Sequence, residues 1–117
     1  MTAAGATETS TPSGGKSFRA VLFKVPNAED RKALIEAYKT LAETNSKNGK
    51  PYILEARASE LLDDPRSQGY TVIGRTVFAS PEDLKYFDEE DPAQVVFREK
   101  VTAWIGDKPI VATVKSV

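Results

Sequence analysis

Hydrophobic and polar positions along this chain follow two periods, one typical of helices and one typical of strands. Apolar residues that recur every three or four positions predict helices over 27–45, 81–87 and 91–105. Short runs rich in branched and aromatic residues predict strands over 18–25, 52–59, 69–79 and 109–114. The predicted order of elements is therefore β-α-β-β-α-α-β.

Each predicted helix begins at a residue that can cap it. Asn27 precedes Glu29 and Asp30, while Ser80 and Asp91 each stand directly before a proline. A side-chain oxygen at the cap accepts hydrogen bonds from the first free backbone N–H groups, and proline suits the first helical position. Residues Asn45 to Gly49 and Gly106 to Lys108 supply the stops of the first and last of these helices.

This order of elements is the split βαβ pattern, so we expect an α+β fold of the ferredoxin-like βαββαβ type. Its four-stranded antiparallel sheet would carry helices on one face. We expect residues 18–117 to form one domain. Residues 1–17 are rich in Ala, Thr, Ser and Gly, which bury too little apolar surface to offset the entropy of ordering, so we expect a disordered tail there.

The predicted strands are apolar on both faces instead of alternating cleanly between apolar and polar residues. In the first strand, Phe18, Ala20 and Leu22 lie on one face, while Val21 and Phe23 lie on the other. Two helices cover only one face, and an exposed apolar patch on a soluble protein usually marks an interaction surface. We therefore expect a homodimer in which two sheets pack against each other.

Composition and charge exclude several classes of site. The formal net charge of −1 provides no basic face for nucleic acid or for an anionic membrane. The chain has no cysteine and no histidine, which excludes disulfides and removes the commonest general base and metal ligand. We expect no metal and no cofactor. Because residues 1–15 contain neither a basic nor an apolar signal region, we expect a cytoplasmic location.

Three sequence blocks resemble the stress-responsive dimeric A/B barrel (Dabb) domain family in their order and spacing. They are FRAVLFKV, GYTVIGRTVFASPEDLKYF and DPAQVVFREKVTAWIGDKPIVATV, which together span about 18–114. The resemblance implies a dimeric α+β barrel with helices outside, in which each subunit keeps a cleft between its helices and its sheet. The family includes a plant polyketide cyclase that uses histidine and tyrosine in that cleft.

The histidines of that cyclase have no counterpart here. Val72 follows the GYT segment where the family has histidine, Gln94 replaces the second histidine of its HPAH turn, and Arg19 aligns with a histidine on the first strand. The resemblance therefore implies the fold and the cleft, but the histidine mechanism cannot be carried over.

We assign Arg19 and Tyr70 as candidate catalytic residues. The ligand is expected to contact five further residues: Tyr38, Val72, Gln94, Phe97 and Trp104. Spacings of three, four and three residues place Gln94, Phe97, Val101 and Trp104 on one helix face, turned toward the sheet. The amide of Gln94 either contacts a ligand or bonds to backbone or water.

The charged candidates and the tyrosines each have a structural alternative. Arg19 either binds a carboxylate or an enolate, or it reaches solvent or pairs with a local acid. A buried tyrosine such as Tyr38 or Tyr70 usually finds a hydrogen-bond partner and nothing more, although in a cavity it acts as a weak acid. We interpret the acidic runs at 88–91 and 63–64 as solvated, since neither matches a known cation loop.

These observations leave two functions open. In the first, an apolar cleft binds a small apolar or carbonyl-rich molecule; as an enzyme it would be a cyclase, isomerase or lyase that acts by positioning and electrostatics. In the second, the protein is a non-catalytic stress-response dimer. A heme- or flavin-linked monooxygenase has only fold analogy in its favour.

Overall fold

The computed structural model describes residues 16–114, and within them it contains one four-stranded antiparallel sheet of order β5-β6-β2-β7. Its strands are β2 (Ser17–Phe23), β5 (Ile53–Glu60), β6 (Val72–Phe78) and β7 (Ile110–Val114). The helices are α1 (Ala28–Thr44), α2 (Pro81–Glu89) and α3 (Pro92–Thr102). The predicted α+β, ferredoxin-like fold is confirmed.

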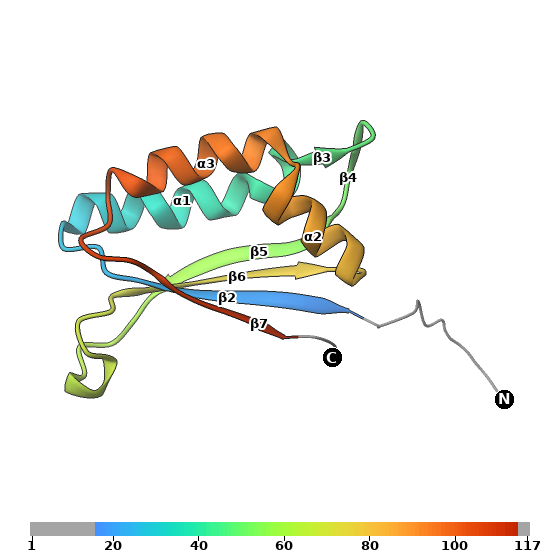
Figure 1. The fold of residues 1–117 in the computed structure, drawn as a ribbon. Coiled ribbons are helices and arrows are strands. Elements are labelled where there is room, and N and C mark those ends of the chain that lie inside the picture. The colour runs from blue at the N-terminus through green and yellow to red at the C-terminus, as the bar shows by residue number, and fades with distance from the viewer. Residues whose placement is uncertain (1–15, 115–117) are drawn as a thin grey trace, which may run out of the picture.

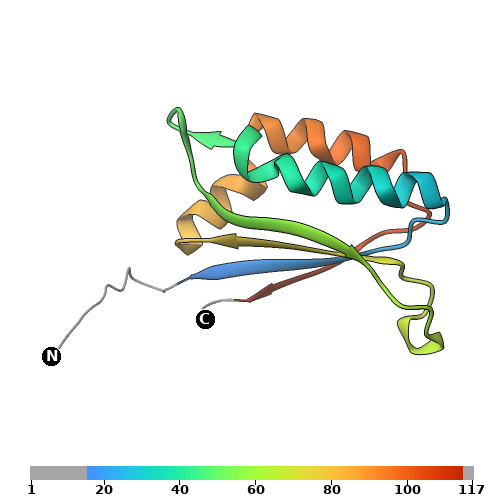
Figure 2. The same ribbon diagram turned by 180° about the vertical axis from the view of Figure 1, so that it is seen from behind.

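The helices lie on one side of the sheet. Figure 1 shows α1 and α3 side by side above the sheet, with α2 near the end of β6. The view from behind in Figure 2 shows that none of the described helices covers the opposite face. We call this uncovered side the open face. None of the described helices is long and apolar enough to cross a membrane.

The strand register decides which side chains face the helices. Arg19 pairs with Thr76 and Thr113, and Val21 pairs with Gly74 and Val111. These residues share the helix-covered face because side chains alternate along a strand. The neighbouring register pairs place a second apolar set on the open face: Phe18, Ala20, Leu22, Ile73, Val77, Ile110, Ala112 and Val114.

The core lies mainly between α1 and the sheet. Leu34, Tyr38 and Leu41 of α1 are buried against a cluster that includes Phe23 and Val72. A second cluster, in which Tyr52, Ile53, Phe78, Leu84 and Phe87 are buried, joins α2 to β5 and β6. The helix that packs directly on a strand is therefore α1, whereas α3 makes few close contacts with the sheet.

The three predicted caps are present. Asn27 Oδ1 accepts hydrogen bonds from the backbone N–H groups of Glu29 and Asp30, at 2.8 and 3.2 Å. Ser80 Oγ accepts from Asp83 N at 3.2 Å, and Asp91 Oδ1 accepts from Ala93 N at 2.9 Å. The local sequence at each start therefore fixed where the helix begins.

Several predicted boundaries were wrong. β2 begins at Ser17, the last residue of the predicted tail; residues 1–15 of that tail lie outside the described residues. β6 begins at Val72 instead of Gly69, because Gln68 and Gly69 have positive φ angles of 54° and 88° and form a turn. α3 ends at Thr102, three residues before the expected end.

The pattern also missed a small hairpin after α1. Strands β3 (Ser46–Lys47) and β4 (Lys50–Pro51) pair across Asn48 and Gly49, whose φ angles are 54° and 78°. An Asn-Gly pair with two positive φ angles suits the tight hairpin turn. The sequence pattern predicts only a helix stop in this segment. A short 3-10 turn, η1 (Pro65–Ser67), lies in the loop between β5 and β6.

Gly74 lies beneath the ring of Tyr38. A Cβ atom on Gly74 would lie 2.3 Å from both Cζ and Oη of Tyr38, far inside van der Waals contact. A glycine inside a strand usually marks either a bulge or the close approach of another group, and at Gly74 it is the close approach of Tyr38. The sheet's register irregularity falls elsewhere, between Ile53 and Glu55 of β5.

Candidate functional site

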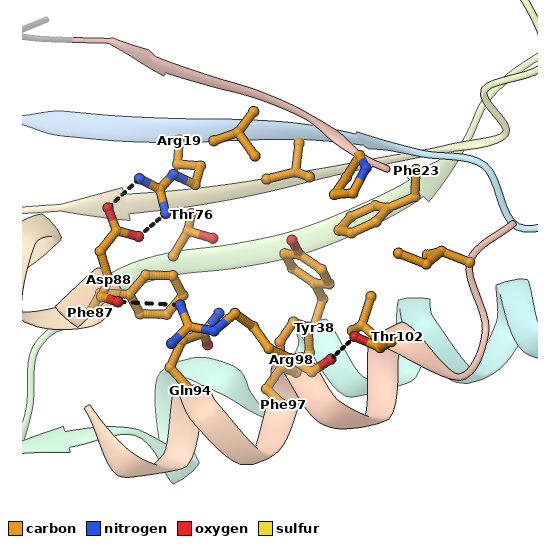
Figure 3. A pocket seen from close by; sticks show the side chains of 15 residues that line it. Arg19, Phe23, Tyr38, Thr76, Phe87, Asp88, Gln94, Phe97, Arg98 and Thr102 are labelled. Atoms are coloured by element: carbon orange, nitrogen blue, oxygen red, sulfur yellow. Dashed lines mark hydrogen bonds and ion pairs between the residues drawn. The ribbon is translucent and has the colours of Figure 1, made fainter. Parts of the chain in front are cut away.

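A pocket of about 420 Å³ lies between α3 and the helix-covered face of the sheet (Figure 3). Its apolar wall comes mainly from Val21, Phe23, Tyr38, Phe97 and Val101. Its polar residues are Arg19, Thr76, Asp88, Gln94, Arg98 and Thr102. We call this cavity the α3 pocket. Its volume is in the range of pockets that hold small organic ligands.

The exposed lining residues mark the opening of the α3 pocket. Arg98 and Thr102 of α3 are exposed, and Val111 on the opposite side is 54% exposed although its strand position faces the helices. Val111 belongs to β7, the edge strand, which leaves one side of the cavity without a neighbouring strand. The pocket therefore opens between α3 and the edge of the sheet.

Arg19 and Asp88 form a two-pronged ion pair at one end of the pocket. Both terminal nitrogens of the Arg19 guanidinium donate to the two carboxylate oxygens of Asp88, as the dashed lines in Figure 3 show. The paired side chains are 14% and 30% exposed. This ion pair connects the end of α2 to β2. Of the alternatives expected for Arg19, the structure shows the pairing with a nearby acid.

Two polar atoms of the pocket residues are sealed from solvent without a partner. Arg19 Nε has no hydrogen-bond acceptor, and Gln94 Oε1 has no donor, among the residues that the structure describes. Gln94 is only 6% exposed. Buried polar atoms in folded proteins are nearly always paired, so two unpaired atoms on lining residues of one cavity make its polar end a candidate binding region.

Tyr38 closes the inner side of the pocket. Its ring packs edge-on against Phe97 and Phe23, with centroid distances of 5.3 and 6.3 Å. Burial raises the pKa of the Tyr38 phenol well above its ordinary value of 10.0, and the positive charge of Arg19 offsets only part of this increase. At neutral pH the phenol is therefore protonated and is available as a hydrogen-bond donor.

A second polar cluster fixes the start of α3. The buried Asp91 carboxylate accepts hydrogen bonds from the Tyr52 hydroxyl, from Asn45 Nδ2 at 3.0 Å and from its cap partner Ala93 N. Burial, followed by the hydrogen bond and negative charge of Asp91, raises the pKa of Tyr52. Because Gln94 lies one turn after Asp91, this cluster also positions the pocket amide.

The structure brings four of the seven predicted site residues to the α3 pocket: Arg19, Tyr38, Gln94 and Phe97. Tyr70 lies before β6, at the far end of β2 from Arg19, and its ring is 4.8 Å from Lys24 Nζ. Val72 is fully buried within the core cluster. Trp104 follows the end of α3 and packs against the core, so it does not continue the helix face that carries Gln94.

Sequence reasoning missed two charged pocket residues, Asp88 and Arg98. Arg98 follows Gln94 by four residues, so helical spacing alone could have placed it on the same side of α3. Asp88 and Asp91 were read as part of a solvated acidic run, and this was wrong. Asp88 pairs with Arg19 and Asp91 is 1% exposed, whereas Glu89 and Glu90 between them are exposed.

Comparisons with known proteins agree with the predicted family. A family model described as the "Stress responsive A/B Barrel Domain" matches residues 18–112. The "Fusaristatin A biosynthesis cluster protein" of Gibberella zeae is 45% identical over 75 residues, which are 64% of this chain and 54% of that protein. The match thus spans about half the length of this curated relative.

Solved structures with the same fold have much lower sequence identity. A dimeric protein of unknown function and ferredoxin-like fold from Bacteroides fragilis is 13% identical, with a TM-score of 0.62 over 86% of this chain and 96% of that one. A hydroxynitrile lyase from Passiflora edulis is 17% identical, with a TM-score of 0.65 over 86% and 92% of the two chains. At these identities the similarity establishes the fold alone.

Proposed function

The chain belongs to the stress-responsive A/B barrel domain family, and from this premise we propose that it is a homodimer in which each subunit binds a small apolar, carbonyl-bearing molecule. The α3 pocket is the observation that carries the proposal, because its apolar wall ends in a few polar groups. This combination is typical of sites in which apolar contacts supply affinity and polar groups fix orientation.

The polar groups of the pocket favour a ligand that accepts hydrogen bonds. Tyr38, Arg19 and Arg98 offer N–H or O–H donors, whereas the one carboxylate among the described lining residues, Asp88, is held by Arg19. Carbonyl oxygens accept hydrogen bonds from such donors, and donors placed in a desolvated site polarise a carbonyl more strongly than water does. The pocket is therefore suited to orient and polarise a carbonyl group.

A catalytic role would be that of a cyclase, isomerase or lyase without a histidine base. Asp88 is engaged in its ion pair, and the Tyr38 phenol, protonated at neutral pH even at its ordinary pKa, is made a still poorer source of a phenolate base by its raised pKa. Rate enhancement would then come from holding the substrate in a reactive shape and from donating hydrogen bonds to developing oxyanions. The name of the Gibberella zeae relative supports a role in biosynthesis.

The second candidate function is a stress-response dimer that binds without catalysis. It is favoured by the lack of a free base among the described pocket residues, since the lone carboxylate is already paired. The two candidates separate once a bound molecule has been identified. A catalyst returns that molecule, or its precursor, with altered mass or connectivity, whereas a binder returns it unchanged. A cytoplasmic location is part of both proposals.

The open face supports the homodimer. Its apolar residues come from three adjacent strands, and Ile110 on the edge strand is 47% exposed. A stable interface needs roughly 800 Å² from each partner, which a four-stranded sheet face can provide. Packing two such faces together would remove this apolar surface from water and leave the α3 pocket of each subunit outside the interface.

Native mass spectrometry of the purified full-length protein tests the pocket proposal, because it reports oligomeric state and retained small molecules together. We expect a dimer that carries a small molecule, and we expect Gln94→Ala and Arg19→Ala to lose it. The exposed Lys39→Ala on α1 is the control. Circular dichroism checks that each variant is folded. If both pocket variants remain folded and retain the same ligand as wild type, the pocket proposal is wrong.

The dimer is tested by a matched pair of substitutions. Ile110 on the open face and Val95 on α3 are each 47% exposed, so aspartate replaces equally exposed apolar residues at the two positions. We expect Ile110→Asp to shift the protein toward monomer in analytical ultracentrifugation, because it places an unpaired charge in the interface. Val95→Asp should remain dimeric. A wild-type monomer at micromolar concentration would contradict the proposal.

A further inference from the structure

We propose that the molecule bound in the α3 pocket is a monocarboxylic acid, with its carboxylate held by Arg98 at the opening and its apolar body lying inside. This inference rests on the proposed function, because it names the chemical class of the ligand of the same pocket.

The charges of the pocket lining do not balance. Among the residues that the structure describes, three charged side chains line it: Arg19, Asp88 and Arg98. Arg19 and Asp88 pair with each other, and Arg98 makes no ion pair within residues 16–114. The lining therefore has an excess of one positive charge. A single unpaired guanidinium matches a monoanion better than a doubly charged phosphate, which is usually held by more than one cation or by several backbone N–H groups.

A hydrogen bond holds Arg98 near the pocket instead of leaving it free in solvent. Its terminal nitrogen donates to the backbone carbonyl oxygen of Asp88 at 3.2 Å, as Figure 3 shows. A guanidinium has five N–H donors in a planar fork, so most remain available after this contact. The preferred partner of such a fork is a carboxylate, which can accept two parallel hydrogen bonds.

The interior of the pocket fits the rest of such a molecule. Phe23, Phe97 and Val101 present apolar surface, and the volume of about 420 Å³ accommodates an aromatic or aliphatic body. A cationic ligand would be repelled by Arg98, and a purely apolar ligand would gain nothing from its guanidinium. An acid with an apolar tail satisfies both ends of the cavity.

The test compares two probes of nearly the same size and shape, the anionic 6-phenylhexanoate and the neutral 6-phenylhexanamide, by isothermal titration calorimetry with the full-length protein at neutral pH and low salt. We expect the acid to bind about tenfold more tightly than the amide, since a charge-assisted hydrogen bond exceeds a neutral one by about this amount. Arg98→Gln should reduce the acid's affinity to that of the amide and leave the affinity of the amide unchanged.

Lys100→Gln is the matched control, because Lys100 is an exposed cation on the same helix that does not line the α3 pocket. The affinity of the acid should change by less than about twofold in this variant, as expected for a screened distant charge. An equal loss in Arg98→Gln and Lys100→Gln would overturn the inference, as would equal binding of acid and amide to wild type. Those results would leave the proposed pocket intact. If neither probe binds and no small molecule co-purifies with the protein, both the pocket proposal and this inference are wrong.

Discussion

Replacing Gly74 by alanine tests the packing on which the α3 pocket is built. The new Cβ would lie 2.3 Å from Cζ and Oη of Tyr38, whereas carbon atoms in contact are normally about 3.5–4.0 Å apart. The Tyr38 ring must therefore withdraw by more than an ångström. The ring is 4% exposed and packs against Phe23 and Phe97, so it can withdraw only by giving up these contacts and moving into the α3 pocket.

Two opposing effects set the magnitude of the change. Overpacking of a close-packed site costs about 1–3 kcal/mol, while alanine restricts the unfolded chain and returns about 0.4–1 kcal/mol. We expect the first to win and Gly74→Ala to lower the free energy of unfolding by about 1–2 kcal/mol, which corresponds to a melting temperature lower by roughly 10 °C. Thermal and urea unfolding followed by circular dichroism measure both quantities.

Two backgrounds at position 38 and one control test whether contact with Tyr38 causes the loss of stability in Gly74→Ala. Tyr38→Phe removes Oη but keeps Cζ, so Gly74→Ala should be about as costly in that background. Tyr38→Leu removes the ring, and there Gly74→Ala should become nearly neutral. Gly106→Ala is the control, because its nearest neighbour would be Pro26 Cγ at 3.4 Å. The reasoning is refuted if Gly74→Ala costs the same with leucine at position 38 as with tyrosine.

Three other predictions follow from the polar groups. The free energy of unfolding should fall as the pH rises above about 10, because Tyr38 and Tyr52 keep their protons in the fold while unfolded phenols lose theirs. Phenolate absorbance should show both tyrosines ionising at a higher pH than free phenols, and Tyr38→Phe should reduce the pH dependence of stability. Asp91→Ala should cost about 3 kcal/mol in urea unfolding, because it removes a cap and leaves two buried donors unpaired; an unchanged midpoint would contradict this. A double-mutant cycle with Arg19→Met and Asp88→Ala should give a coupling energy of about 1–3 kcal/mol, whereas a value near zero would show that the ion pair does not hold α2.

Local sequence signals predicted the parts of the fold that depend on neighbouring residues. The caps at Asn27, Ser80 and Asp91 are correct because a cap needs only its own side chain and the next few backbone N–H groups. The ends of the elements were less predictable. The helix face carrying Gln94 was expected to reach Trp104, but α3 ends at Thr102, and periodicity alone gives no signal for that stop.

The pocket residues likewise divide into those that local spacing predicts and those that only the packing of distant elements places. Gln94 and Phe97 could be predicted because their helical spacing places them toward the sheet. Tyr70 could not be placed correctly, because the positive φ angles of Gln68 and Gly69 delay the start of β6 and leave it in a turn. The pairing of Arg19 with Asp88 joins residues 69 positions apart, and its register depends on how α2 packs on the sheet. No local pattern contains that information.

The acidic run between α2 and α3 links the core to the pocket. Asp88 stands in the last turn of α2 and holds Arg19, while Asp91 caps α3 and accepts hydrogen bonds from Tyr52 and Asn45. Moving either carboxylate would shift one end of the α3 pocket, because Arg98 also bonds to the backbone of Asp88 and Gln94 follows Asp91 by one turn. The run looked uniform in the sequence, since four successive acids have no periodicity. Burial makes the first and last of them different from the two between, and this difference places at the same cavity both Arg98, which makes no ion pair within residues 16–114, and the unpaired Oε1 of Gln94.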